Sequence, residues 1–286
     1  MSDNMTVTTS AKFIPEIWSM DVLKAAEAAL VISPLVKHFD SMVKKAGDVL
    51  HIPKLSNLSA NNKVANTDVT KQTVTEDEVL LNINLHKETS FEIEDIVTAQ
   101  SNYDLRALYT QKAGYAQSQA IDTSLATLAE GFSGIVGSAG AALTDATIVA
   151  AIQHLDEANA PLEDRALVLK PSGKADIMKL DKFVSATYLG RFNESSPVVK
   201  GPNSRFLWGE IYGVPVYYTT QVTTTAGSPA TKNNFLMHKE ALAIAVQQAP
   251  RVQVAYWLPS LAYKVVCDTI YGVVELRDDY GVLIKS

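Results

Sequence analysis

A helical pattern of unusual length is the feature that most constrains this chain. From Ser101 to Leu128, small or apolar residues recur mostly every three or four positions, which predicts one packed face of a helix. That face carries Leu105, Leu108, Ala113, Ala116, Ala120, Ser124 and Leu128. Ser101 can cap the start, and a glycine-rich stretch from Gly131 ends the helix. About 28 residues would span roughly 42 Å. We therefore expect a long spine helix rather than a helix packed inside a core. A long helix in an ordinary α+β domain fits the periodicity equally well.

Two strand patterns flank a long polar stretch ahead of this helix. Asp48–Leu55 forms the first pattern, and the alternation of apolar and polar residues over 79–86 forms the second. The stretch Ser56–Asp77 between them is polar and almost free of bulky groups, which is unusual for a loop inside a compact domain. We therefore predict an extended hairpin at residues 47–86 that projects from the body.

The N-terminal segment holds large apolar residues that it has little room to bury by itself. Phe13, Ile14 and Trp18 follow a mostly polar stretch of twelve residues, which lacks the apolar centre of a signal peptide. Asp21–Leu30 has a short helical pattern that Pro34 stops. Such an arm docks either on its own core or on a neighbouring molecule, and the residues alone leave both open.

The rest of the chain alternates short strand and helix patterns, which predicts a compact α/β unit within an α+β protein. Thr144 can cap a helix that ends before Pro161, and a strand at 166–169 leads into a helix at 171–180. The stretch 240–248 fits either helix or strand. Further strand patterns lie at 211–222, 251–256, 262–266, 272–276 and 281–284.

Composition excludes several classes of protein. A hydrophobic fraction of 47% in 286 residues supports a real core and argues against global disorder. The formal net charge of −6 is not that of a protein that coats itself in nucleic acid. Cys267 is the only cysteine, so an internal disulfide is excluded and a reducing compartment is indicated. No run of eighteen apolar residues occurs, so we expect no membrane span.

Motifs for catalysis, metal binding or cofactor binding are incomplete. Ser172–Lys174 resembles the end of a phosphate loop, but Val168 stands where the first glycine is needed. Five histidines show no metal-ligand spacing. Asp278 and Asp279 could be paired catalytic carboxylates, but a turn between two strands explains them at least as well. We therefore expect no catalytic, metal or cofactor-binding residue, and we do not expect an enzyme.

An acidic cluster accompanies the second strand of the predicted hairpin. Its members are His86, Glu88, Glu92, Glu94 and Asp95. Carboxylates grouped in this way can bind a hard cation, or they can form a solvated, ion-pairing surface. We favour the second interpretation.

Four local patterns, in this order along the chain, are similar to those of a known family. They are Arg165–Pro171 (RALVLKP), Gly209–Val216 (GEIYGVPV), Phe235–Leu242 (FLMHKEAL) and Leu276–Val282 (LRDDYGV). Together with the order of elements, they resemble the major capsid protein of tailed bacteriophages, which has the Hong Kong 97-like fold. The resemblance covers almost the whole chain.

The resemblance implies an α+β capsid fold with four parts. Residues 1–46 would form the N-terminal arm and a short helix, and 47–86 would form the extended hairpin loop that lies over a neighbouring subunit. Residues 87–139 and 249–286 would form a peripheral domain with the spine helix, and 140–248 an α/β axial domain.

The resemblance also implies a structural protein that self-assembles into the icosahedral head enclosing a phage genome. The implied partners are the chain itself in hexamers and pentamers, a scaffolding protein, a portal protein, an optional decoration protein, and double-stranded DNA held without sequence-specific contacts. The location would be the virion, assembled in the host cytoplasm, without a membrane. The expected interface residues are Phe13, Ile14, Trp18, Lys54, Asn57, Lys63, Asn66 and Lys71.

Two departures from relatives refine these expectations. Some relatives begin with a long helical scaffolding segment, whereas here the apolar arm starts about a dozen residues into the sequence, so we expect a separate scaffolding protein. Some relatives crosslink a loop lysine to a neighbour's asparagine, and we do not predict such a crosslink. Two alternatives stay open: a shell protein of an encapsulin-type nanocompartment, and an α+β hydrolase or carbohydrate-binding protein using Glu92, Glu94 or Asp278.

Overall fold

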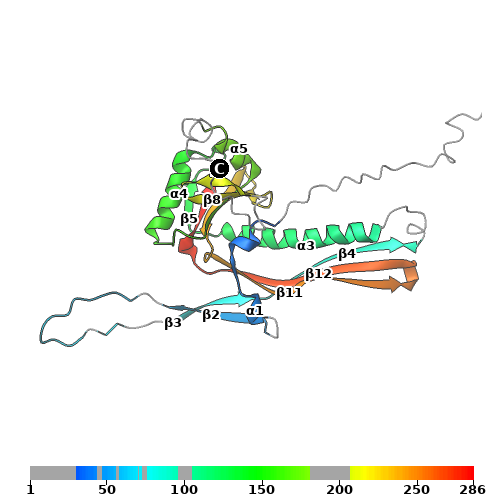
Figure 1. Ribbon diagram of the computed structural model, residues 1–286, viewed down its shortest axis with the longest axis horizontal. Coiled ribbons are helices and arrows are strands. Elements are labelled where there is room, and N and C mark those ends of the chain that lie inside the picture. The colour runs from blue at the N-terminus through cyan, green and yellow to red at the C-terminus, as the bar shows by residue number, and fades with distance from the viewer. Residues whose placement is uncertain are drawn as a thin grey trace, which may run out of the picture.

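The computed structural model describes residues 30–43, 47–55, 58–69, 71–72, 76–95, 105–180 and 207–286. It consists of a seven-stranded sheet with two helices, a four-stranded sheet with one long helix along it, and a two-stranded hairpin. The long sheet and its helix extend to one side of the seven-stranded unit, and the tip of the hairpin extends to the other (Figure 1). The described part of the molecule is therefore elongated. The helix expected at 21–30 lies outside the described residues.

The long helix α3 spans Leu105–Ala129 and confirms the expected helix over its described part. Its predicted start at Ser101 lies outside the described residues. Its buried stripe is centred one position away from the predicted one, because Gln117, Ile121 and Leu125 are buried. Tertiary hydrogen bonds satisfy the amide nitrogen of Gln117, since Nε2 donates to Thr89 Oγ1 at 2.9 Å and to the Cys267 carbonyl at 3.1 Å. Its Oε1 is buried without a hydrogen-bond partner among the described residues.

The four-stranded sheet runs beneath α3 in the order β1-β11-β12-β4. Its strands are β1 (Lys37–His38), β11 (Leu242–Trp257), β12 (Ala262–Glu275) and β4 (Leu85–Glu94). The undecided stretch 240–248 is thus mostly strand, and the separate strands expected at 251–276 belong to two long ones. The hydroxyl of Tyr271 joins sheet to helix, since it lies 2.9 Å from Ser124 Oγ and 3.2 Å from the Ala120 carbonyl.

The seven-stranded sheet has the order β5-β13-β10-β6-β8-β7, with β9 paired to β10. Its strands are β5 (Gly134–Gly137), β13 (Gly281–Lys285), β10 (Thr231–His238), β6 (Arg165–Leu169), β8 (Val214–Tyr218), β7 (Leu207–Ile211) and β9 (Thr224–Thr225). Helices α4 (Asp145–Glu157) and α5 (Pro171–Ile177) pack with it. As expected, Thr144 caps α4 by accepting the N–H of Thr147. β13 lies in this sheet, not with the long strands beside which the sequence analysis placed it.

The hairpin pairs β2 (Val49–Leu55) with β3 (Glu76–Asn82) and confirms the predicted strand at 48–55. The second strand expected over 79–86 is divided, because β3 ends at Asn82 and β4 begins at Leu85 in a different sheet. Helix α1 (Asp40–Val43) lies at the hairpin base. There Leu81 and Ile83 join Val43 and two alanines of β11 in a small core.

Gly272 allows the hairpin base to approach the long sheet. A Cβ atom at Gly272 would overlap with the backbone oxygen of Asn82 and press on the Leu81 side chain. We expect Gly272→Ala to lower the free energy of unfolding by about 2 kcal/mol, because a backbone atom has to shift. The matched control is Gly114→Ala within α3, where nothing lies within 4 Å and helix propensity favours alanine. Urea unfolding of the unassembled chain measures both, and equal stability of the two variants would contradict the prediction.

Candidate assembly surfaces

The hairpin loop is the most exposed described part of the chain. Residues 58–69 and 71–72 are all exposed, including the apolar Leu58, Val64 and Val69. The loop has local order of its own. Lys63 Nζ donates to the carbonyls of Val64 and Thr67, and the amide side chain of Gln72 bonds the backbone of Ser59. A loop that holds its shape while exposing apolar groups is a candidate for contact with another molecule.

The structure places half of the interface residues predicted from the sequence. Lys54 lies in β2 opposite Asp77, and Lys63, Asn66 and Lys71 lie in the exposed loop. Asn66 has a φ of 61° and occupies the turn that Lys63 closes. The side chain of Lys63 therefore stabilises the conformation of its own loop. Phe13, Ile14, Trp18 and Asn57 lie outside the described residues.

A buried carboxylate ties the start of the described chain to α3. Asp122 accepts the backbone N–H groups of Val31, Ile32 and Ser33 at 2.8, 3.3 and 2.9 Å. Burial raises the pKa of Asp122, although the three N–H groups favour its charged form. This contact fixes Val31–Ser33 against α3.

We expect Asp122→Ala to lower the free energy of unfolding by about 3 kcal/mol, because it leaves several buried N–H groups without an acceptor. The control is Asp68→Ala in the exposed loop, expected within about 0.5 kcal/mol of the parent chain. Urea unfolding of the unassembled chain measures the stability of both variants. If Asp122→Ala unfolds at the same urea concentration as its control, the anchor is not structural.

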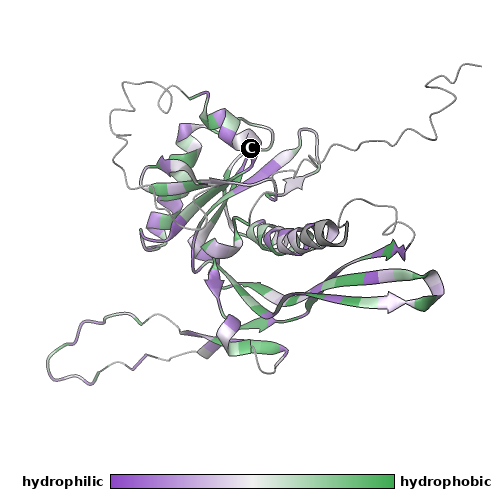
Figure 2. Cartoon of the chain, turned by 45° about the vertical axis from the view of Figure 1, so that its right-hand side comes forward, coloured by the Kyte–Doolittle hydropathy of each residue, from purple (hydrophilic) through white to green (hydrophobic). Residues whose placement is uncertain are grey.

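The outer end of the β11–β12 hairpin is a second exposed surface, and the sequence analysis did not identify it. Its exposed large apolar residues are Val252, Val254, Tyr256, Trp257, Leu258, Leu261 and Tyr263. The turn itself, η2 (Leu258–Ser260), is apolar where turns are usually polar, with Leu258 72% and Trp257 55% exposed. The sequence feature that could have revealed this surface is the run Trp-Leu-Pro-Ser-Leu between two strand patterns. Figure 2 shows the long sheet coloured by hydropathy, with hydrophobic green at its outer end. Exposed apolar groups gathered in one place mark an interaction surface.

The face of the long sheet away from α3 carries charges that are paired. Asp268 bonds Arg251 Nε at 2.9 Å, Gln248 at 2.8 Å and His86 at 3.3 Å. The Arg251 hydrogen bond holds the pKa of Asp268 well below its usual range. Glu92 pairs with Lys264 at 3.4 Å. Within the acidic cluster, Glu92 is thus paired with Lys264 and His86 is hydrogen-bonded to Asp268 across the sheet. Among the described residues, no group of His, Cys, Asp and Glu is arranged to hold a metal.

Two carboxyl groups meet where the chain passes from the long sheet to the seven-stranded one. Glu275 ends β12, and Asp278 begins the short helix η3 (Asp278–Tyr280) that precedes β13. Burial and the neighbouring Asp278 raise the pKa of Glu275 to about 7. Burial would also raise the pKa of Asp278, but the hydroxyl and the N–H of Ser133 bring it below its ordinary value. The bonds from Ser133 to Asp278 join this passage to the segment after α3.

Glu275 gives the fold a pH dependence. In the folded chain it keeps its proton up to about pH 7, whereas the unfolded chain releases it near the ordinary pKa of 4.5. The unfolded state then binds fewer protons, so stability is expected to fall as pH rises from about 5 to about 8. Glu275→Gln should flatten that slope, and Glu88→Gln, on an exposed part of β4, should keep it. Urea midpoints of the unassembled chain at several pH values test this, and equal slopes in both variants would refute it.

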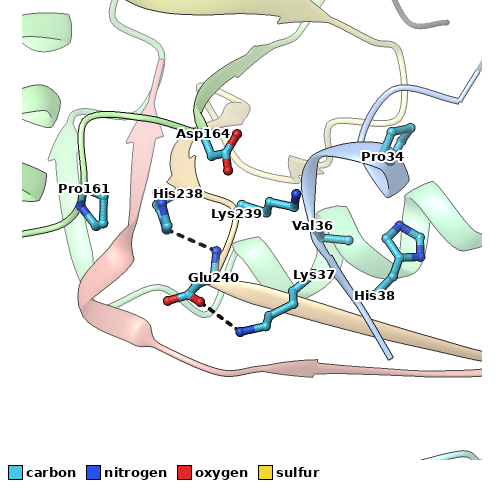
Figure 3. Close-up of a pocket in the computed structure, with 9 residues that line it drawn as sticks. All are labelled: Pro34, Val36, Lys37, His38, Pro161, Asp164, His238, Lys239 and Glu240. Atoms are coloured by element: carbon cyan, nitrogen blue, oxygen red, sulfur yellow. Dashed lines mark hydrogen bonds and ion pairs between the residues drawn. The ribbon is translucent and has the colours of Figure 1, made fainter. Parts of the chain in front are cut away.

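A hollow of about 610 Å³ lies where η1 (Ser33–Leu35) and β1 meet the turn between β10 and β11 (Figure 3). Lys37 Nζ lies 2.9 Å from Glu240 Oε1, and His238 Nδ1 accepts the N–H of Glu240. Burial lowers the pKa of His238, which favours the neutral ring that can accept this bond. Two lysines and two carboxylates balance around the hollow. We interpret it as part of the contact between the N-terminal segment and the body.

Comparisons with known proteins agree with this architecture. No family model and no curated protein matches. A solved chain of Mycobacterium phage Che8 is 22% identical with a TM-score of 0.76, over 95% of this chain and 97% of that one. A chain of the Cyanophage Pam1 capsid asymmetric unit is 14% identical with a TM-score of 0.72, over 100% and 98%. The Cyanophage P-SCSP1u capsid gives 16% identity and a TM-score of 0.70, over 99% and 96%.

This chain has a phage capsid fold. The α+β class predicted from the sequence is confirmed, and the likeness extends over nearly the whole chain. Within the described residues, no helix is long and apolar enough to cross a membrane. The surfaces of interest are therefore the hairpin loop, the N-terminal anchor and the outer end of β11 and β12.

Proposed function

We propose that this chain is a major capsid protein that self-assembles into the icosahedral head enclosing a phage genome. The observation that carries the proposal is the likeness to capsid chains over the whole length, with a TM-score of 0.72 over 100% of this chain for the Cyanophage Pam1 capsid. The exposed apolar groups of the hairpin loop and of the β11–β12 end support it, because another subunit would remove them from water.

In this proposal each unit of the fold has a place in the shell. The helix α3 and the four-stranded sheet correspond to the peripheral domain, the seven-stranded sheet to the axial domain, and the β2–β3 hairpin to the extended loop over a neighbour. The boundary drawn at 249–286 from the sequence is then divided, since β12 belongs to the peripheral sheet and β13 to the axial sheet. Within 87–139, β5 likewise goes to the axial sheet.

Assembly by head-to-tail contacts closes into rings, which gives hexamers and pentamers as the building blocks. The proposed partners beyond the chain itself are a separate scaffolding protein, a portal protein, an optional decoration protein and double-stranded DNA. The net charge of −6 fits a capsid shell that encloses DNA without binding it tightly. The proposed location is the virion, after assembly in the host cytoplasm.

Negative-stain electron microscopy of the full chain, expressed with and without its genomic neighbours, tests this function. We expect closed shells, tubes or rings, and DNA rather than an enzyme as the cargo. Enzyme-filled shells would favour the nanocompartment alternative. A uniform monomer under both conditions would contradict the proposal and favour the hydrolase alternative, whose candidate carboxylates Asp278 and Glu92 are bonded to Ser133 and Lys264.

The hairpin loop is expected to be needed for assembly and not for folding. Leu55 lies directly opposite Glu76, so residues 56–75 can be replaced by Asn-Gly, which closes a two-residue hairpin turn. We expect the unfolding midpoint of the unassembled chain to change little, because none of the described loop residues (58–69 and 71–72) belongs to a buried core cluster. Shells should no longer form. Shells of normal diameter from this variant, seen by electron microscopy, would show that the loop makes no necessary contact.

A further inference from the structure

The outer half of β11 is an open strand edge. β1 pairs with β11 only at Ala243 and Ile244. The next positions are covered by α1 and the segment after it, since Asp40 accepts the N–H of Val246 at 2.7 Å and Gln247 Nε2 donates to the Gly47 carbonyl at 3.0 Å. From Arg251 to Trp257 no strand of the described residues lies along this edge. Every second residue of an edge strand turns its N–H and C=O away from its partner, where they can bond an added strand.

One side of this edge carries a row of apolar side chains. Val252, Val254 and Tyr256 lie opposite Cys267, Val265 and Tyr263 of β12, and residues directly opposite share a face. It is the face on which Tyr271 bonds α3. Val265 and Cys267 of β12 are buried here, whereas the row on β11 is 40 to 47% exposed. The row and the open edge together fit an extended apolar segment added beside β11.

The arm of this chain has the chemistry and the length for that position. Phe13, Ile14, Ile17 and Trp18 are apolar, and Glu16 is the one charge among residues 13–18. Trp18 precedes Leu30 by twelve residues, which reach about 40 Å when extended. The anchor at Asp122 lies about 26 Å along α3 from the first residue of that helix. The segment can therefore reach the outer half of this sheet or of an adjacent copy.

Pro15 decides how the segment could pair. It has no N–H, so it is tolerated in an edge strand only where its backbone turns away from the partner. Ile14 and Glu16 would then direct their backbone groups to β11. Because side chains alternate, Phe13, Pro15 and Ile17 would lie together on one face, and Ile14, Glu16 and Trp18 on the other. The all-apolar face matches the row on β11, and Glu16 falls on the charged face that holds Arg251 and Asp268.

We propose that residues 13–18 of one copy add as a strand to the outer edge of β11 in a neighbouring copy, with Phe13, Pro15 and Ile17 packed on Val252, Val254 and Tyr256. This rests on the proposed shell function and names the surface that receives the arm. The contact combines backbone hydrogen bonds, which give affinity, with alternate side chains that fix the register. It would link subunits without using the hairpin loop.

Disulfide trapping in assembled full-length chains tests the docking. Both variants carry Cys267→Ala to remove the native thiol, together with Ile17→Cys. The test variant adds Val254→Cys, and the control adds Gln253→Cys, which is adjacent in sequence and exposed but on the other face of β11. After mild oxidation, non-reducing electrophoresis should show a ladder of covalent multimers for the test variant, at least fivefold stronger than for the control.

The outcomes separate this proposal from the proposed function. Particles whose test variant gives only intramolecular disulfides would mean that the arm docks on its own sheet, and the proposal would be overturned. Particles with no ladder, or with equal ladders in both variants, would overturn it as well while leaving the shell function standing. A parent chain that forms no particle under any condition would remove the shell function and the docking together. In the parent background, Val254→Glu should abolish particles while leaving the urea midpoint within error of the parent.

Discussion

The packing of α3 on the long sheet is the contact on which the rest of the structure depends. Tyr271 bonds both Ser124 and the Ala120 carbonyl, and Gln117 bonds Thr89 and Cys267 from the same helix. These bonds hold a single helix against a four-stranded sheet, which is wider than the helix. Its cover reaches β4 and β12 but leaves the outer half of β11 exposed. The surfaces available for assembly follow from this mismatch in width.

Local patterns predicted the elements whose signal is contained in their own residues. The length of α3, the Thr144 cap and the strand at 48–55 belong to this group. The buried stripe of α3 could not be read correctly, because Gln117 and Asp122 are buried only through partners far away in the sequence. The division at Ile83 was also hidden, since the alternating pattern continues while the chain changes from one sheet to another. Placement of β13 depends on pairing with β10 and β5, which a single strand does not reveal.

The candidate assembly surfaces also divide into one that the sequence predicts and one that it does not. The hairpin loop was predictable, because a mostly polar stretch of about twenty residues between two strands is unusual inside a compact domain. The apolar end of β11 and β12 was missed, because isolated apolar residues in a strand suggest a core unless the cover is known. The charged residues are the opposite case, because some that are conspicuous in the sequence have partners within the chain. The acidic residues of β4 stand out in the sequence, yet they lie on a face where Glu92 and Asp268 have partners.

The position of the Glu275–Asp278 pair has a mechanical consequence. β12 runs 14 residues from this passage to the turn with β11, and at the usual rise per residue that is about 45 Å. Because α3 packs along the long sheet, a rotation at this passage would carry helix and sheet together. A rotation of about 10° there moves the far end by about 8 Å, given that length and rise. A small rotation at this passage would thus become, at the outer end of the sheet, a displacement larger than the separation of two neighbouring strands.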